Sequence, residues 1–225
     1  MSQSRVFCFR HVERNKSNTD DPQTPTAGGQ ITAYAMGREI RRRFNPTVMT
    51  RTTSPQPRGM RTDVIFCQGL VGWEGTPGRE LPEQTIDQRL NDFSTDSRDQ
   101  IAEGVAAAKT YAKLHGVEAE QGVFMTPQGK VALRIKVGEM IEVIDELGSQ
   151  AGDHLMTGLH GAGIDGACIE LNQRLDEDYP DGMGANGGMF DKVEGFVATF
   201  EDGKLVSIEI VRQPDYLKTL ATVIE

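Results

Sequence analysis

The chain has 225 residues, of which 37% are hydrophobic and 25% charged, so it can bury the core of one large α/β domain and is not disordered throughout. Its 33 acidic residues outnumber its 24 basic ones, and the net charge of −9 opposes non-specific binding to nucleic acid or to an anionic membrane. The sequence contains no apolar run of about 18 residues and no apolar signal core in residues 1–10. We therefore expect an unexported, cytoplasmic protein with no membrane partner.

Strands and helices alternate along the chain. Short β-branched or apolar runs predict the strands, and apolar residues spaced three and four apart predict the helices. The expected strands cover 5–9, 47–53, 154–159, 196–200 and 205–211, and the expected helices cover 33–43, 60–67, 101–112, 133–147 and 164–171. Thr26 is the expected cap of the first helix, and the turn at 201–204 is typical of a hairpin. This order predicts one three-layer domain over 1–225, with a mainly parallel sheet flanked by helices.

Two long connections interrupt this alternation. The segment 69–99 is rich in Gly and Pro and is predicted to be a loop excursion, and 100–150 is predicted to be a helical segment. The stretch Gly182–Gly187 matches the G-x-G-x-x-G pattern by letter, but it follows an acidic loop and precedes a strand. A dinucleotide site requires the opposite context, so we interpret this stretch as a flexible loop.

Basic side chains follow three of the predicted strands. Arg10, His11 and Arg14 follow the first strand, Arg58 follows the second, and His160 follows the strand at 154–159. Because the carboxyl ends of parallel strands meet at one edge of the sheet, these groups are expected to converge on one site. Guanidinium groups pair with tetrahedral oxyanions, and helix N-termini add main-chain donors. The sequence therefore predicts a phosphate site in an acidic protein.

The same segments resemble the histidine phosphatase superfamily, the phosphoglycerate mutase-like group. The segment Arg10–Arg14 is similar to its Arg-His-Gly-Glu signature, with Val12 in place of glycine, and Thr26–Gly37 is similar to its loop-to-helix pattern. Ser54–Thr62 resembles its Ser-Pro-x-x-Arg-x-x-x-Thr block, and His160-Gly161 resembles its second histidine motif. The resemblance implies a phosphoglycerate mutase-like fold.

The resemblance also implies roles for these side chains. His11 would be the nucleophile that becomes phosphorylated, while Arg10, Arg58 and His160 would hold the phosphoryl oxygens. Arg14 is a further candidate phosphate ligand, although a solvated arginine on a polar loop is an equally good interpretation. A neutral imidazole can attack phosphorus without a metal ion when cations neutralise the oxygens, so neither a metal nor a cofactor is expected.

The family supplies its proton donor from a carboxylate in the connection after the second block. The candidates there are Glu74, Glu80, Glu83, Asp87 and Asp92. Leu90–Phe93 is most similar to the Leu-x-Glu pattern of the family, so Asp92 is the predicted acid, with Glu80 and Glu74 as the alternatives.

Phosphate monoester hydrolysis through a phosphohistidine on His11 is the function that these residues predict. The alternatives are a phosphoglycerate-type mutase and a non-catalytic phosphate-binding module of the same fold. The expected partner is a small phosphorylated metabolite or a phosphoprotein, and the oligomeric state stays open. His115 and His154 lie outside any metal-ligand spacing and are interpreted as surface or structural residues. Three cysteines cannot all pair, and their apolar neighbours predict reduced, buried thiols.

Overall fold

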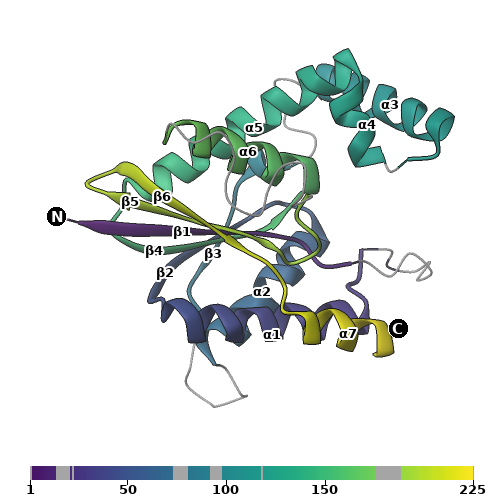
Figure 1. The fold of residues 1–225 in the computed structure, drawn as a ribbon. Coiled ribbons are helices and arrows are strands. Elements are labelled where there is room, and N and C mark those ends of the chain that lie inside the picture. The colour runs from purple at the N-terminus through teal and green to yellow at the C-terminus, as the bar shows by residue number, and fades with distance from the viewer. Residues whose placement is uncertain are drawn as a thin grey trace.

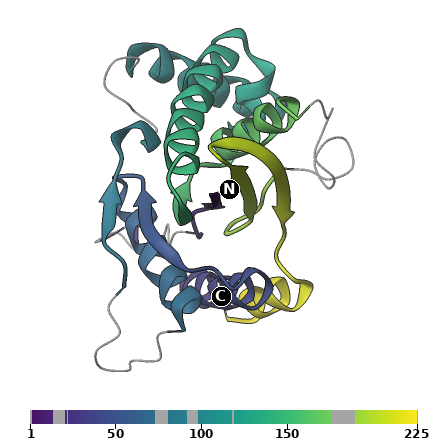
Figure 2. The same cartoon turned by 90° about the vertical axis from the view of Figure 1, so that its left-hand side faces the viewer.

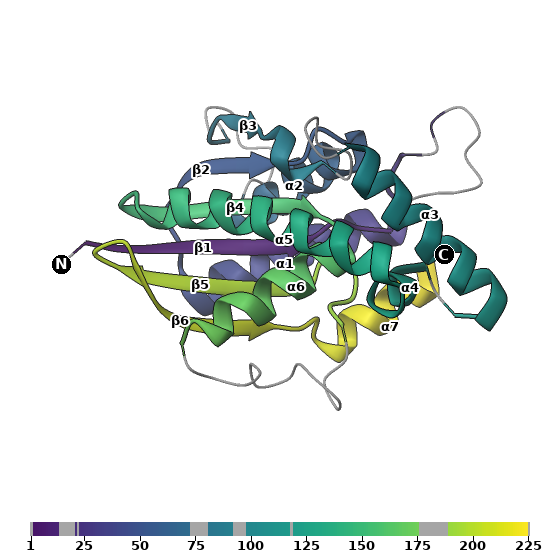
Figure 3. The same cartoon turned by 90° about the horizontal axis from the view of Figure 1, so that it is seen from above.

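A sheet of six strands runs through the middle of the molecule. The computed structural model describes residues 2–13, 21, 23–72, 81–91, 98–117, 119–175 and 189–224. The strands are β1 (Gln3–Arg10), β2 (Val48–Thr53), β3 (Gln84–Ile86), β4 (Gly152–Leu159), β5 (Gly195–Glu201) and β6 (Lys204–Val211). Their order across the sheet is β3-β2-β4-β1-β5-β6 (Figure 3). The first four of these are parallel neighbours, whereas β5 runs antiparallel to both β1 and β6.

Helices cover both faces of the sheet. They are α1 (Ala27–Phe44), α2 (Pro57–Val71), α3 (Arg98–His115), α4 (Ala119–Met125), α5 (Pro127–Gly148), α6 (Gly161–Gln173) and α7 (Asp215–Ile224), with a 3-10 helix η1 at Gln88–Leu90. Figure 1 shows α5 and α6 on one face and α1, α2 and α7 on the other, and α3 and α4 extend beyond the sheet from the side of α5. Figure 2 shows the two helical layers with the sheet between them.

Strand β1 contributes to both cores because its side chains alternate between the two faces. Val6 and Cys8 pack under α5 and α6, whereas Phe7 and Phe9 pack against α1 and α2. A strand buried on both faces has a continuous apolar sequence, as parallel central strands do. Because helices pack on both faces of β1, its carboxyl end, where the polar sequence begins, lies between the two helical layers.

The sequence correctly predicted the fold class, a single three-layer domain with a mainly parallel sheet. The hairpin of β5 and β6 and the side-chain cap of α1 by Thr26 are confirmed, because Thr26 Oγ1 accepts a hydrogen bond from Gly29 N at 3.0 Å. Cys8, Cys67 and Cys168 are buried and free, as expected.

The segment 69–99 is not entirely loop. Helix α2 continues to Val71, and β3 and η1 lie at 84–86 and 88–90. The sequence did not predict β3, since three residues are too short to show a strand period, nor did it predict α7. The segment 100–150 contains α3, α4 and α5. None of the described helices has the length and apolar character needed to cross a bilayer.

Candidate active site

Two histidines lie at the carboxyl ends of neighbouring parallel strands. His11 follows β1 and His160 follows β4, and the His11 main-chain N–H donates to the carbonyl of Leu159 at 3.1 Å. The two imidazole rings face each other edge to plane, with centroids 5.1 Å apart and an interplanar angle of 60°. The structure therefore brings together two histidines that lie far apart in the sequence.

The tautomer of His11 follows from its hydrogen bond. Nδ1 of His11 lies 2.7 Å from the carbonyl oxygen of Val12, and a carbonyl can only accept. Nδ1 therefore carries the proton, and Nε2 keeps its lone pair. Burial lowers the pKa of His11 far below the usual range of an imidazole, and the nearby His160 and Arg58 lower it further. The ring is therefore neutral at physiological pH, which is the state that nucleophilic attack by an imidazole requires.

His160 has the opposite tautomer. Nη2 of Arg58 lies 3.0 Å from His160 Nδ1, and because a guanidinium only donates, Nδ1 accepts. The proton of a neutral His160 is then on Nε2, where it can be donated to an oxyanion. Burial lowers the pKa of His160, followed in effect by Arg58 and Lys136. His160 also lies at the N-terminus of α6, whose dipole favours bound anions.

Close main-chain packing sets the position of Arg58. Gly158 of β4 has φ +74, and a Cβ there would lie 2.6 Å from the Cα of Gly59, so the first turn of α2 rests directly on the end of β4. Thr62 Oγ1 donates to the Arg58 carbonyl at 2.7 Å and accepts from Val12 N at 3.3 Å. These contacts join the start of α2 to both strand ends that carry the histidines.

Arg10 is the last residue of β1 and is only 5% exposed. Its main-chain N–H donates to the carbonyl of Glu194 at 2.9 Å, and its Nη1 donates to the carbonyl of Phe190 at 2.6 Å. Its positive charge helps to lower the pKa of His160, which places the guanidinium within electrostatic range of that ring. A planar guanidinium can bind a phosphoryl group through paired hydrogen bonds.

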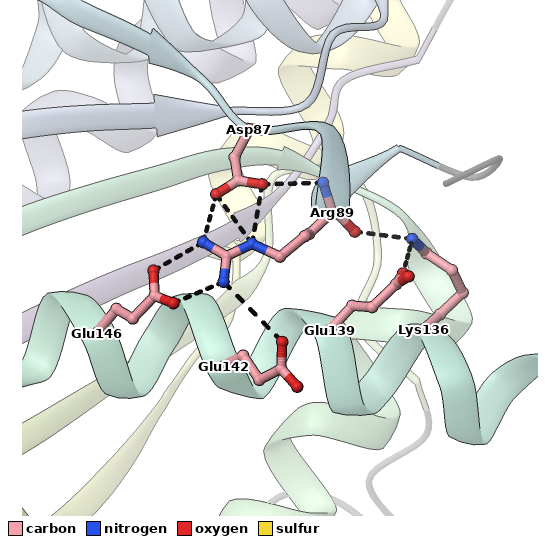
Figure 4. A network of polar contacts seen from close by, with 6 residues as sticks. All are labelled: Asp87, Arg89, Lys136, Glu139, Glu142 and Glu146. Atoms are coloured by element: carbon pink, nitrogen blue, oxygen red, sulfur yellow. Dashed lines mark hydrogen bonds and ion pairs between the residues drawn. The ribbon is translucent and has the colours of Figure 1, made fainter. Parts of the chain in front are cut away.

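The structure adds two lysines that sequence reasoning missed. Lys192 lowers the pKa of both His11 and His160, and Lys136 lowers that of His160. Lys136 lies on α5, and its Nζ donates to the Arg89 carbonyl at 2.7 Å (Figure 4). Neither lysine follows a strand of the parallel set, so the positions of the strand ends do not predict them. Both lysines thus lie within electrostatic range of the site histidines.

Several predicted residues lie outside the described part of the chain. These are Arg14, Glu74, Glu80, Asp92 and the glycine-rich stretch Gly182–Gly187. Among the other carboxylates considered, Glu83 is exposed and Asp87 accepts a hydrogen bond from Arg89 at 2.7 Å. Asn91, the neighbour of Asp92, has Oδ1 3.5 Å from Nε2 of Gln56, the N-cap of α2.

A polar network joins η1 to α5 immediately before Asn91 in the chain. The Arg89 guanidinium contacts Asp87 on its own segment through three nitrogen–oxygen pairs and Glu146 on α5 through two, and it lies 3.9 Å from Glu142 (Figure 4). The guanidinium of Arg89 is about one-third exposed, so water weakens each ion pair, but the paired geometry fixes the orientation of η1. Lys136 lies beside this network and forms an ion pair with Glu139.

The other two histidines have local contacts. His154 is buried in β4, with Nδ1 2.8 Å from Thr50 Oγ1, and His115 is exposed and stacks on Tyr111 with ring centroids 4.1 Å apart. Across the ranges that the structure describes, no group of three or more His, Cys, Asp or Glu side chains could hold a metal ion.

Comparison with known proteins identifies the fold. No family model matches the sequence, and no curated protein matches it. Among solved structures, a phosphoglycerate mutase from Bacillus anthracis aligns with 97% of each chain at 13% identity and a TM-score of 0.59. A phosphoserine phosphatase from Entamoeba histolytica aligns at 14% identity and a TM-score of 0.52, covering 95% of this chain and 99% of its own. The protein histidine phosphatase SixA, solved with tungstate, aligns at 12% identity and 0.51, covering 96% and 99%. The chain therefore shares the fold of these proteins, a phosphoglycerate mutase-like fold.

Proposed function

We propose that the protein hydrolyses phosphate monoesters through a phosphohistidine on His11. The observation that carries this proposal is the pair of tautomers at the strand ends. Nε2 of His11 keeps its lone pair because Val12 accepts from Nδ1, while Nε2 of His160 has a proton because Arg58 donates to its Nδ1. One ring is thus prepared to attack phosphorus, and the ring beside it is prepared to stabilise the oxygens.

In the first step the Nε2 lone pair of His11 forms a bond to phosphorus, and the bond between phosphorus and the ester oxygen breaks. The departing oxygen takes a proton from a carboxylic acid, for which we propose Asp92. Arg10, Arg58 and His160 stabilise the charge on the three other phosphoryl oxygens. The imidazole becomes cationic as it is phosphorylated, and the Val12 carbonyl favours that cation because it accepts from Nδ1.

In the second step water attacks the phosphohistidine. The carboxylate left at Asp92 takes a proton from the water, the phosphorus–nitrogen bond breaks, and inorganic phosphate leaves with the water oxygen. His11 returns to its neutral form, so a second turnover can begin. Two displacements replace one difficult attack of water on the ester. Neither step uses a metal ion or a cofactor.

The fold neighbours support this class of reaction. Their names include a phosphoglycerate mutase, a phosphoserine phosphatase and a protein histidine phosphatase, so this fold serves small phosphorylated molecules as well as phosphoproteins. For this chain we propose a small phosphorylated metabolite or a phosphoprotein as the substrate, in the cytoplasm. Fold alone does not select among them, because the residues that contact the substrate vary within a fold.

A panel of phosphate esters tests the proposal. The purified protein is incubated with p-nitrophenyl phosphate, sugar phosphates, phosphoserine, phosphoglycerate and a phosphohistidine peptide, and inorganic phosphate is measured. We expect hydrolysis that the His11→Asn variant lacks. Isomerisation of phosphoglycerate that depends on a priming phosphate donor would instead show a mutase. Phosphate binding without turnover of any ester would show a binding module and would refute the proposal.

A further inference from the structure

Phe190 connects the predicted phosphate ligand Arg10 to a buried carboxylate. The Phe190 main-chain N–H donates to Asp165 Oδ1 at 2.8 Å, and the Phe190 carbonyl accepts from Arg10 Nη1 at 2.6 Å. Asp165 and Phe190 are each 1% exposed. Both main-chain polar groups of one residue are therefore bound inside the protein, one to a carboxylate and one to a guanidinium.

Further contacts fix the same short segment. The Phe190 ring stacks near Phe196 of β5, with centroids 6.2 Å apart, and the Arg212 guanidinium lies 4.8 Å from the Phe190 ring centroid. Arg212 Nη1 also donates to Glu194 Oε2 at 2.7 Å, and the Glu194 carbonyl accepts from Arg10 N. The segment 189–194 thus holds Arg10 by its main chain and by its side chain.

We propose that Asp165 is a positioning residue for the phosphate site, acting through the Phe190 main chain on the guanidinium of Arg10. The inference rests on the proposed function, since it assigns Arg10 to the phosphoryl oxygens. Asp165 lies on α6, the helix that begins at His160, so one helix orients both a histidine and an arginine of the site. None of the sequence motifs includes Asp165.

Removing the carboxylate has a definite physical consequence. Without Asp165 the buried Phe190 N–H has lost its carboxylate acceptor. An unpaired buried donor is unfavourable, so the main chain is stabilised when it turns toward another acceptor. Its carbonyl then leaves the position that holds Arg10 Nη1. Because a hydrogen bond to the charged guanidinium is lost, we expect Asp165→Ala to raise the Kd for inorganic phosphate about tenfold. The KM for an ester should rise by a similar factor.

A matched control separates positioning from stability. Asp153 is also buried, and it also accepts a hydrogen bond from a main-chain N–H, that of Thr47 at 2.8 Å. It is the second residue of β4, however, and therefore lies at the opposite end of this strand from His160. Asp153→Ala should lower Tm without changing the Kd for inorganic phosphate, measured by calorimetry. Asp165→Asn keeps an oxygen acceptor for Phe190 and should restore most of the affinity.

A double-mutant cycle tests the route through Arg10. If Asp165 acts through Arg10, then Asp165→Ala should weaken phosphate binding less than twofold in an Arg10→Ala background. Additive losses in the double variant, or an unchanged Kd and KM in Asp165→Ala, would overturn the inference. If Asp165→Ala does not fold, the cycle is run with Asp165→Ser, whose side chain is too short to reach the Phe190 N–H. A wild-type protein that hydrolyses no ester refutes the proposed function separately, because the calorimetry does not depend on turnover.

Discussion

Acid should destabilise this protein through its two neutral histidines. The pKa values of His11 and His160 are both lowered in the folded protein, chiefly by burial. In the unfolded chain an imidazole takes up a proton near pH 6.5. Between the lowered pKa and this value the unfolded state binds more protons than the folded state, so stability falls as the pH falls below about 6.5.

The size of the effect follows from the same linkage. A histidine that stays neutral when folded and has a pKa of about 6.5 when unfolded costs about 1.9 kcal/mol between about pH 7 and about pH 5. Two such histidines cost about 4 kcal/mol, which is a large part of the typical stability of a domain. Carboxylates also titrate in this range, but they contribute equally to a wild-type protein and to a histidine variant.

The measurement is urea unfolding of the wild-type protein and of His11→Asn at both pH values. Asn does not titrate, so the variant should lose about 1.9 kcal/mol less than the wild type on acidification. Between about pH 8 and about pH 9 the difference between the two proteins should be constant, which serves as the internal control. An equal loss in both proteins at acid pH would mean that folded His11 takes up a proton as readily as it does in the unfolded chain, and the lowered pKa of His11 would be wrong.

Three further predictions concern the site. Asp92→Asn should lower turnover of an alkyl phosphate by about 10²- to 10⁴-fold, because its basic alkoxide leaving group needs a proton. Phosphorylation of His11 by p-nitrophenyl phosphate should stay nearly unchanged. If Glu80→Gln or Glu74→Gln shows this selective loss instead, that residue is the acid. Activity should survive EDTA, and orthovanadate should inhibit, whereas loss with EDTA and rescue by a divalent ion would contradict a mechanism without metal. Gly158→Ala should lower the free energy of unfolding in urea by at least about 1–2 kcal/mol, because alanine is strained at this positive φ. It should also lower kcat/KM, because it displaces Arg58. Wild-type values for both would contradict the proposed packing of α2 on β4.

The convergence of the site was predictable because it depends on topology. Residues that follow parallel strands meet at one edge, so the sequence positions of His11, Arg58 and His160 were enough to expect one site. The tautomers were not predictable, since they depend on which atom lies beside each ring nitrogen. The Val12 carbonyl selects one tautomer and a guanidinium selects the other.

Other contributors lacked any signal in the sequence. Lys136 lies on a helix whose apolar spacing predicts only packing, and Asp165 looks like one more polar residue on α6. Their importance depends on which elements pack against them, which a single sequence does not encode locally. Strand β3 was missed for a different reason, because its three residues are too few to show a strand period.

Trapping the intermediate tests the central claim most directly. The protein is mixed with a radiolabelled phosphate ester, quenched within the first turnover and digested, and the labelled peptide is sequenced. We predict label on the peptide that contains His11, stable to base and labile to acid as a phosphohistidine is, and no label in the His11→Asn variant. A base-labile acyl phosphate, or label retained after His11→Asn, would contradict the account.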